Sequence, residues 1–190
     1  MISKYIAQYR ELEKGRYGFV VDITLFTLIT YGFHLIFRYF SAEIMSVPFV
    51  LNSASWLAYA VYVVALWINQ NILGMEIITR PVNSMWFPNE YGIIVNNSCS
   101  GLKQFYQVIV LFVLFPGPWK HKLWFIPLGF FAMFATNVFR IVALSEIMAW
   151  KPEYFAFCHT WILRPFFYVV LFALWVWWVE KFRRRDGVAK

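Results

Sequence analysis

The run KLWFIPLGFFAMFATNVFRIVALSEIMAW, from Lys122 to Trp150, decides the fold class of this chain. A run of this length exceeds the roughly 20 apolar residues that cross a bilayer as a helix. Four other apolar runs approach or reach that length, namely Phe19–Phe40, Ser53–Leu73, Leu102–Phe115 and Thr160–Val179. We therefore predict an all-α, polytopic membrane helical bundle with about five membrane helices.

Composition agrees with a lipid-embedded chain. Of its 190 residues, 61% are hydrophobic and only 14% are charged, and the mean hydropathy is +0.58. An average globular domain has about 45–50% apolar and about 25% charged residues, so a disordered, nucleic-acid-binding or ordinary soluble protein is disfavoured. The length suits one domain, and we take residues 1–190 as a single integral-membrane domain whose main partner is the lipid bilayer.

The basic residues behind the net charge of +7 lie mainly at the chain ends and in one turn. They are Lys4, Arg10, Lys14 and Arg16 before the first run, Lys120 and Lys122 around the turn, and Lys181, Arg183, Arg184, Arg185 and Lys190 at the end. Basic loops stay on the cytoplasmic side. The sequence therefore predicts a cell-membrane protein with a cytoplasmic C-terminus, and it places Gly74–Gly101 and Lys151–His159 outside.

Gly74–Gly101 is the one sizeable polar interval, and its turn residues and short apolar groups predict brief extended pieces in a small extracytoplasmic cap. The front half of the chain conflicts with this topology. A basic N-terminus should also be cytoplasmic, yet two full spans would return the chain to the cytoplasm before Gly74. We expect Ser53–Leu73 to be re-entrant or to lie partly in the interface; an external N-terminus is the alternative.

Cys99 is the first candidate for chemistry. It comes just before the run that starts at Leu102, and the positive end of a helix favours a thiolate over a thiol. Ser100 and Gly101 follow it, and the glycine would allow a substrate backbone to approach closely. Gln104 and Gln107 could face the same site from the next turn. The alternative is a small buried residue packed at a helix cap.

Arg140 is the second candidate, because a charge within an apolar run is costly and usually marks function. Eighteen residues at about 1.5 Å each put it roughly 27 Å beyond Lys122, near the outer boundary of a hydrocarbon core about 30 Å thick. Asn137 precedes it by three residues and shares its helix face. Alternatively, Arg140 reaches the outer headgroups or pairs with Glu146.

His159 stands immediately before the last run and, by the same topology, on the outer side. Cys99, Arg140 and His159 thus come from three segments at one depth. A thiol nucleophile, a histidine for proton transfer and a fixed cation for an oxyanion suffice for acyl transfer. His121 falls in the cytoplasmic turn. His34 and Arg38 form an i, i+4 pair for which we expect packing or headgroup contact.

At these residues the chain resembles the exosortase/archaeosortase family of membrane-embedded cysteine transpeptidases, over roughly Leu73–Phe182. The matching features are Asn97-Ser98-Cys99-Ser100-Gly101-Leu102, then Asn137-Val138-Phe139-Arg140, then His159 before the final helix. Archaeosortases carry a second arginine where exosortases carry histidine, so His159 favours the exosortase branch, in a short form. Thr160 stands where family members often have an acidic residue.

The resemblance implies catalysis by Cys99, Arg140 and His159, with Asn137, Ser100, Gly101 and Gln104 in support. It also implies a membrane-anchored protein substrate whose C-terminal sorting signal has a short motif, a transmembrane helix and a basic tail. The enzyme would cleave that signal at the outer membrane face and pass the protein to an acceptor.

Two other functions remain open from the sequence. Cys99 and Cys158 could form the redox pair of a membrane thiol-disulfide oxidoreductase, or the chain could be a non-enzymatic membrane scaffold or small transporter. We expect no cofactor and no metal, because the three histidines and two cysteines show no ligand spacing. A nucleic-acid partner is not expected.

Overall fold

A computed structural model of the protein describes residues 18–183. The helices are α2 (Gly18–Tyr39), α3 (Ser41–Ser46), α4 (Pro48–Asn71), α5 (Leu102–Leu114), α6 (Trp119–Trp150), α7 (Phe155–Phe157) and α8 (Arg164–Trp178). The strands are β1 (Ile78–Arg80), β2 (Ser84–Trp86) and β3 (Gly92–Ile94), with 3-10 turns η1 (Asn97–Cys99) and η2 (Pro152–Tyr154) and π-helical segments η3 (Cys158–Leu163) and η4 (Val179–Arg183). The basic residues of both chain ends, at 4–16 and 184–190, lie outside the described residues.

The predicted all-α membrane bundle is confirmed. Four helical stretches in the described residues are long and apolar enough to cross a membrane: Gly18–Tyr39, Pro48–Asn71, Trp119–Trp150 and Pro152–Phe182. The fifth predicted run is also helical, but α5 has only 13 residues. At about 1.5 Å per residue it covers roughly 20 Å, less than a hydrocarbon core of about 30 Å. The count of about five membrane helices thus becomes four long stretches and one short helix.

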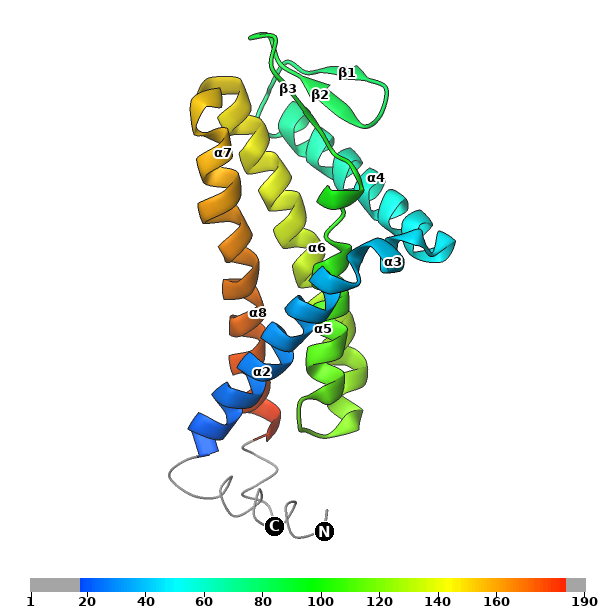
Figure 1. The fold of residues 1–190 in the computed structure, drawn as a ribbon. Coiled ribbons are helices and arrows are strands. Elements are labelled where there is room, and N and C mark those ends of the chain that lie inside the picture. Colours follow the sequence, from blue (N-terminus) through cyan, green and yellow to red (C-terminus); the bar gives the residue numbers. More distant parts are fainter. Residues whose placement is uncertain (1–17, 184–190) are drawn as a thin grey trace.

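Helices α2 and α4 climb the bundle in succession (Figure 1). The lower part of α2 packs Phe26 on Trp175 near the end of α8, whereas its upper part hydrogen-bonds His34 to Tyr168. Helix α4 starts beside η1 and ends at the sheet, where Asn69 contacts Met85. Together they carry the chain once from the end that holds the α5–α6 turn to the end that holds the sheet.

This path is compatible with the cytoplasmic N-terminus that the basic residues predict. Because two tilted helices share one traverse, the start of α2, the α5–α6 turn and the end of α8 lie at the same end of the bundle (Figure 1). Ser53–Leu73 is not re-entrant, since α4 is one continuous helix of 24 residues; that it lies partly in the interface stays a prediction. The sheet and the α6–α7 junction lie together at the opposite end.

The interval before Cys99 forms the short extended pieces that the sequence predicts. They pair as a three-stranded antiparallel sheet in the order β1-β2-β3, with Met85 opposite Thr79 on one side and Ile93 on the other. Met85 and Ile93 are buried in a cluster that α4 and α6 complete with Val61 and Ile141. The sheet therefore has its own apolar floor and caps one end of the bundle.

The opposite half of the bundle is held by an aromatic core. Phe125 of α6 meets Phe112 at 4.9 Å and Trp178 at 5.1 Å between ring centroids. Lys122 also belongs here. We expected it to flank a turn as a topology anchor, but it is 3% exposed and donates to the carbonyls of Val113 and Phe115. Its ammonium satisfies backbone acceptors that α5 leaves unpaired at its end.

Candidate functional site

Cys99 ends a short turn that the preceding asparagines shape. The Asn96 side chain accepts a hydrogen bond from the Ser98 amide at 3.0 Å, and the Cys99 amide donates to the Asn96 carbonyl at 2.8 Å. The Ser55 hydroxyl of α4 donates to the Asn97 side-chain oxygen at 3.1 Å. The cysteine is thus held in a defined backbone turn that is tied to a neighbouring helix, and its side chain is half-buried.

Gly101 and Ser100 connect this turn to α5. Gly101 has φ +79°, a conformation that side-chain-bearing residues rarely adopt, and a Cβ there would lie 2.9 Å from Asn137 Nδ2. Ser100 is buried and its hydroxyl accepts from the Leu102 amide at 3.2 Å. Both residues therefore shape the backbone of this turn and allow α6 to approach it closely.

Asn137 and Arg140 reach the cysteine from α6. Asn137 Nδ2 donates to the Cys99 carbonyl oxygen at 2.8 Å, and an Arg140 Nη donates to the same oxygen at 3.4 Å. Their spacing of three residues places both on one helix face, as the sequence predicts. Asn137 is fully buried and Arg140 is 6% exposed, so the two side chains hold the cysteine backbone from inside the protein.

The Arg140 guanidinium has no acidic partner among residues 18–183. It lies over the Phe167 ring at 5.4 Å, and its Nε is buried without a hydrogen bond. Its hydrogen-bond partner is the Cys99 carbonyl oxygen, at 3.4 Å from an Nη. The alternatives of a pair with Glu146 or a headgroup contact at the surface are therefore wrong, and Arg140 is a buried cation beside a thiol.

His159 lies in the π-helical segment that precedes α8. Pro165 has no amide hydrogen, so it cannot donate to the backbone carbonyl four residues back, and its ring crowds that carbonyl. The wider turn of a π-helix relieves this crowding. The imidazole stacks on Phe155 at 5.8 Å with an interplanar angle of 6°. The charged side chains that act on it are Arg164 and Arg140, both positive.

The structure thus gathers most of the residues that the sequence singles out. Cys99, Ser100, Gly101, Asn137 and Arg140 form one contiguous unit, and His159 is within electrostatic reach of Arg140. Gln104 lies half-buried in the first turn of α5. Cys158 and Cys99 are both free thiols. Across residues 18–183, no three His, Cys, Asp or Glu side chains come together as a metal site.

Two basic residues near the site were not predicted from the sequence. Arg164 acts on both Arg140 and His159, and Lys103, four residues after Cys99, binds His34 at 3.0 Å. Each is a charge within or beside an apolar run, which is the signal that singled out Arg140. The same rule applied to every run would have found them.

Searches against family models, curated proteins and solved structures returned no match to this chain.

Proposed function

We propose that this chain is a membrane-embedded cysteine transpeptidase of the exosortase type. It would cleave the C-terminal sorting signals of exported proteins at the outer face of the cell membrane. The cleaved proteins would then be transferred to an acceptor. The observation that carries the proposal is the meeting of a half-buried thiol with a buried, unneutralised arginine. Arg140 donates to the Cys99 carbonyl oxygen at 3.4 Å, and its positive charge also acts on His159.

In the proposed reaction His159 takes the proton of the Cys99 thiol, the resulting thiolate attacks the scissile carbonyl carbon, and the carbonyl oxygen becomes an oxyanion. Arg140, whose Nε has no partner, stabilises this charge. The intermediate collapses to a thioester as the peptide C–N bond breaks, and His159 gives the leaving nitrogen a proton. An acceptor nucleophile, deprotonated by His159, then attacks the thioester and releases Cys99.

The site also suits a substrate that is itself anchored in the membrane. The turn η1, which ends at Cys99, connects β3 to the short helix α5, and the sheet and the α5–α6 turn lie at opposite ends of the bundle (Figure 1). If the C-terminus is cytoplasmic, as we propose, the thiol would lie toward the outer side. A sorting signal with a transmembrane helix would then present its cleavage position at the depth of Cys99.

The test compares cells that carry wild-type protein with cells that carry Cys99→Ala, Cys99→Ser or Cys158→Ser. C-terminal peptide mapping of the exported and membrane proteins measures which chains lose a terminal transmembrane helix and basic tail. We expect both Cys99 variants to insert at normal levels and to leave those tails in place, while Cys158→Ser processes normally. Unchanged processing in Cys99→Ala would refute the proposal, and equal damage by Cys158→Ser would favour thiol-disulfide exchange.

A further inference from the structure

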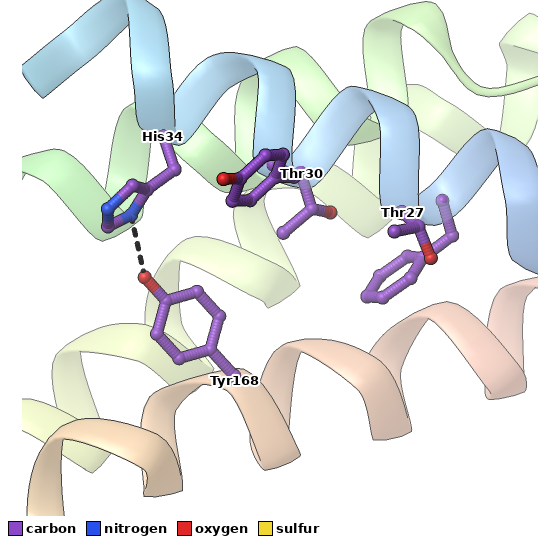
Figure 2. A pocket seen from close by; sticks show the side chains of 6 residues that line it. Thr27, Thr30, His34 and Tyr168 are labelled. Carbon is purple, nitrogen blue, oxygen red and sulfur yellow. Dashed lines mark hydrogen bonds between the residues drawn. The ribbon is translucent and has the colours of Figure 1, made fainter.

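A groove on the bundle surface lies between α2 and α8, apart from the Cys99 site. It has a volume of about 350 Å³. Figure 2 shows His34 and Tyr168 meeting at one end of it and the threonines of α2 lying along it. The residues that line it are Phe26, Thr27, Thr30, Tyr31, His34 and Tyr168. Thr27 and Tyr31 are exposed, so the groove opens to the outside of the bundle.

One end of the groove is basic. Lys103 Nζ and the Tyr168 hydroxyl both lie 3.0 Å from His34 Nδ1. An ammonium can only donate, so Nδ1 accepts from it and His34 carries its proton on Nε2. Arg38 follows His34 by one helical turn and adds a second fixed charge. The three basic side chains thus present several donors on one side of α2.

Within residues 18–183 these basic side chains have no carboxylate partner. The charged groups that act on His34 are Lys103 and Arg38, and none of the three has a carboxylate partner. Further along the groove, Thr30 is 8% exposed and its hydroxyl has no hydrogen-bond partner. Basic side chains without a carboxylate partner make this end of the groove complementary to an anionic molecule.

The exposed surface of α2 indicates that the anionic molecule is a lipid. Only 11% of its apolar window is buried inside the protein, so most of the helix surface faces lipid. The twelve residues from Phe26 to Arg38 rise about 18 Å, close to the roughly 15 Å of one leaflet of a hydrocarbon core about 30 Å thick. An acyl chain that starts at the basic end therefore has the length to reach Phe26.

We propose that the α2–α8 groove binds one anionic phospholipid, with its phosphate at Lys103, His34 and Arg38 and one acyl chain along Thr30 toward Phe26. The bound lipid fills the gap between two helices that meet mainly through aromatic rings at their other end. This proposal stands independently of the chemistry at Cys99.

The first test is native mass spectrometry of the detergent-purified protein with dioleoylphosphatidylglycerol, dioleoylphosphatidylcholine or inorganic phosphate. We expect one phosphatidylglycerol to be retained. Lys103→Gln should weaken retention about tenfold, the loss expected for one charge-assisted hydrogen bond. Lys120→Gln, at an exposed position beyond the α5–α6 turn, should not. Equal retention of both lipids, no effect of Lys103→Gln, or competition by millimolar phosphate would each overturn the proposal.

The second test separates the acyl chain from the headgroup. Thr30→Trp fills the groove and should abolish retention of phosphatidylglycerol. Leu28 lies on the opposite side of α2 and is 66% exposed, so Leu28→Trp should leave retention unchanged. A photo-crosslinking residue at Thr27 in native membranes should yield an adduct with the mass of a phospholipid. An adduct with a second copy of this chain or with another polypeptide would show that a protein helix occupies the groove instead.

Discussion

Replacing Gly101 by alanine should disturb the Cys99 turn through one identifiable contact. The added Cβ would lie 2.9 Å from Asn137 Nδ2 and 3.2 Å from Asn137 Cγ, closer than neighbouring groups accept. Asn137 is fully buried and its amide donates to the Cys99 carbonyl at 2.8 Å. The amide therefore has to move, and the hydrogen bond that anchors the cysteine backbone is lost.

The size of the effect follows from two separate costs. A side chain at φ +79° costs about 1–2 kcal/mol. Leaving the buried Asn137 amide without its acceptor costs about 1–3 kcal/mol more. Gly74→Ala provides the matched control, because Gly74 has φ +65° and nothing within 4 Å of the added Cβ. It carries the backbone cost alone, so Gly101→Ala should be the more destabilising of the two by about 1–3 kcal/mol.

The assay is equilibrium unfolding in mixed detergent micelles for wild type, both glycine variants, Asn137→Ala and the double variant Gly101→Ala/Asn137→Ala. Because Asn137→Ala removes the group that Cβ meets, the two changes should be less costly together than the sum of the single changes. If Gly101→Ala and Gly74→Ala lose equal stability, or if the two site changes add, then the close approach of Asn137 to this turn does not constrain it.

Lys122 and the two thiols give further measurable outcomes. Lys122→Met removes two hydrogen bonds from an ammonium to carbonyls at the end of α5 and should lower the free energy of unfolding by about 2–3 kcal/mol. The exposed Lys120→Met should change it by less than about 0.5 kcal/mol; equal losses in the two variants would contradict the capping role. A membrane-impermeant maleimide applied to intact cells should label Cys99 in the Cys158→Ser variant. Labelling of Cys99 only after the cells are opened would place the thiol on the cytoplasmic side and contradict the proposed topology.

Hydropathy predicts the membrane-crossing helices because a bilayer imposes length and composition on each one separately. The helices begin and end within a few residues of the predicted runs, with two exceptions: α4 begins five residues before the predicted Ser53, and the helical stretch that contains α8 begins at Pro152 rather than at Thr160. What hydropathy cannot supply is the arrangement between helices. That α2 and α4 share one traverse depends on contacts such as Phe26 with Trp175, which join residues far apart in the chain.

The candidate site also has one part that the sequence predicts and another that it does not. The helical period alone puts Asn137 and Arg140 on one face, and the structure has them on the same Cys99 oxygen. The partners of each residue are set by tertiary packing and could not be predicted. Phe155 stacks on His159 and Phe167 lies under Arg140, although neither aromatic residue differs from its many apolar neighbours in sequence.

Burying Arg140 costs folding free energy, and a catalytic role would explain why the protein keeps it. A guanidinium that is 6% exposed, without a carboxylate partner and with an unpaired Nε, lowers the stability of the folded protein. The Phe167 ring and the Cys99 carbonyl offset only part of that cost. A negative charge that develops beside Arg140 during a reaction would offset the remainder of that cost. Stabilisation that appears only as the reaction proceeds is the kind that accelerates a chemical step.

Arg140→Lys keeps the charge but loses the planar donors. We therefore expect Arg140→Lys to fold while losing most of the activity proposed for Cys99. A fully active Arg140→Lys enzyme would mean that Arg140 supplies only a general positive charge there.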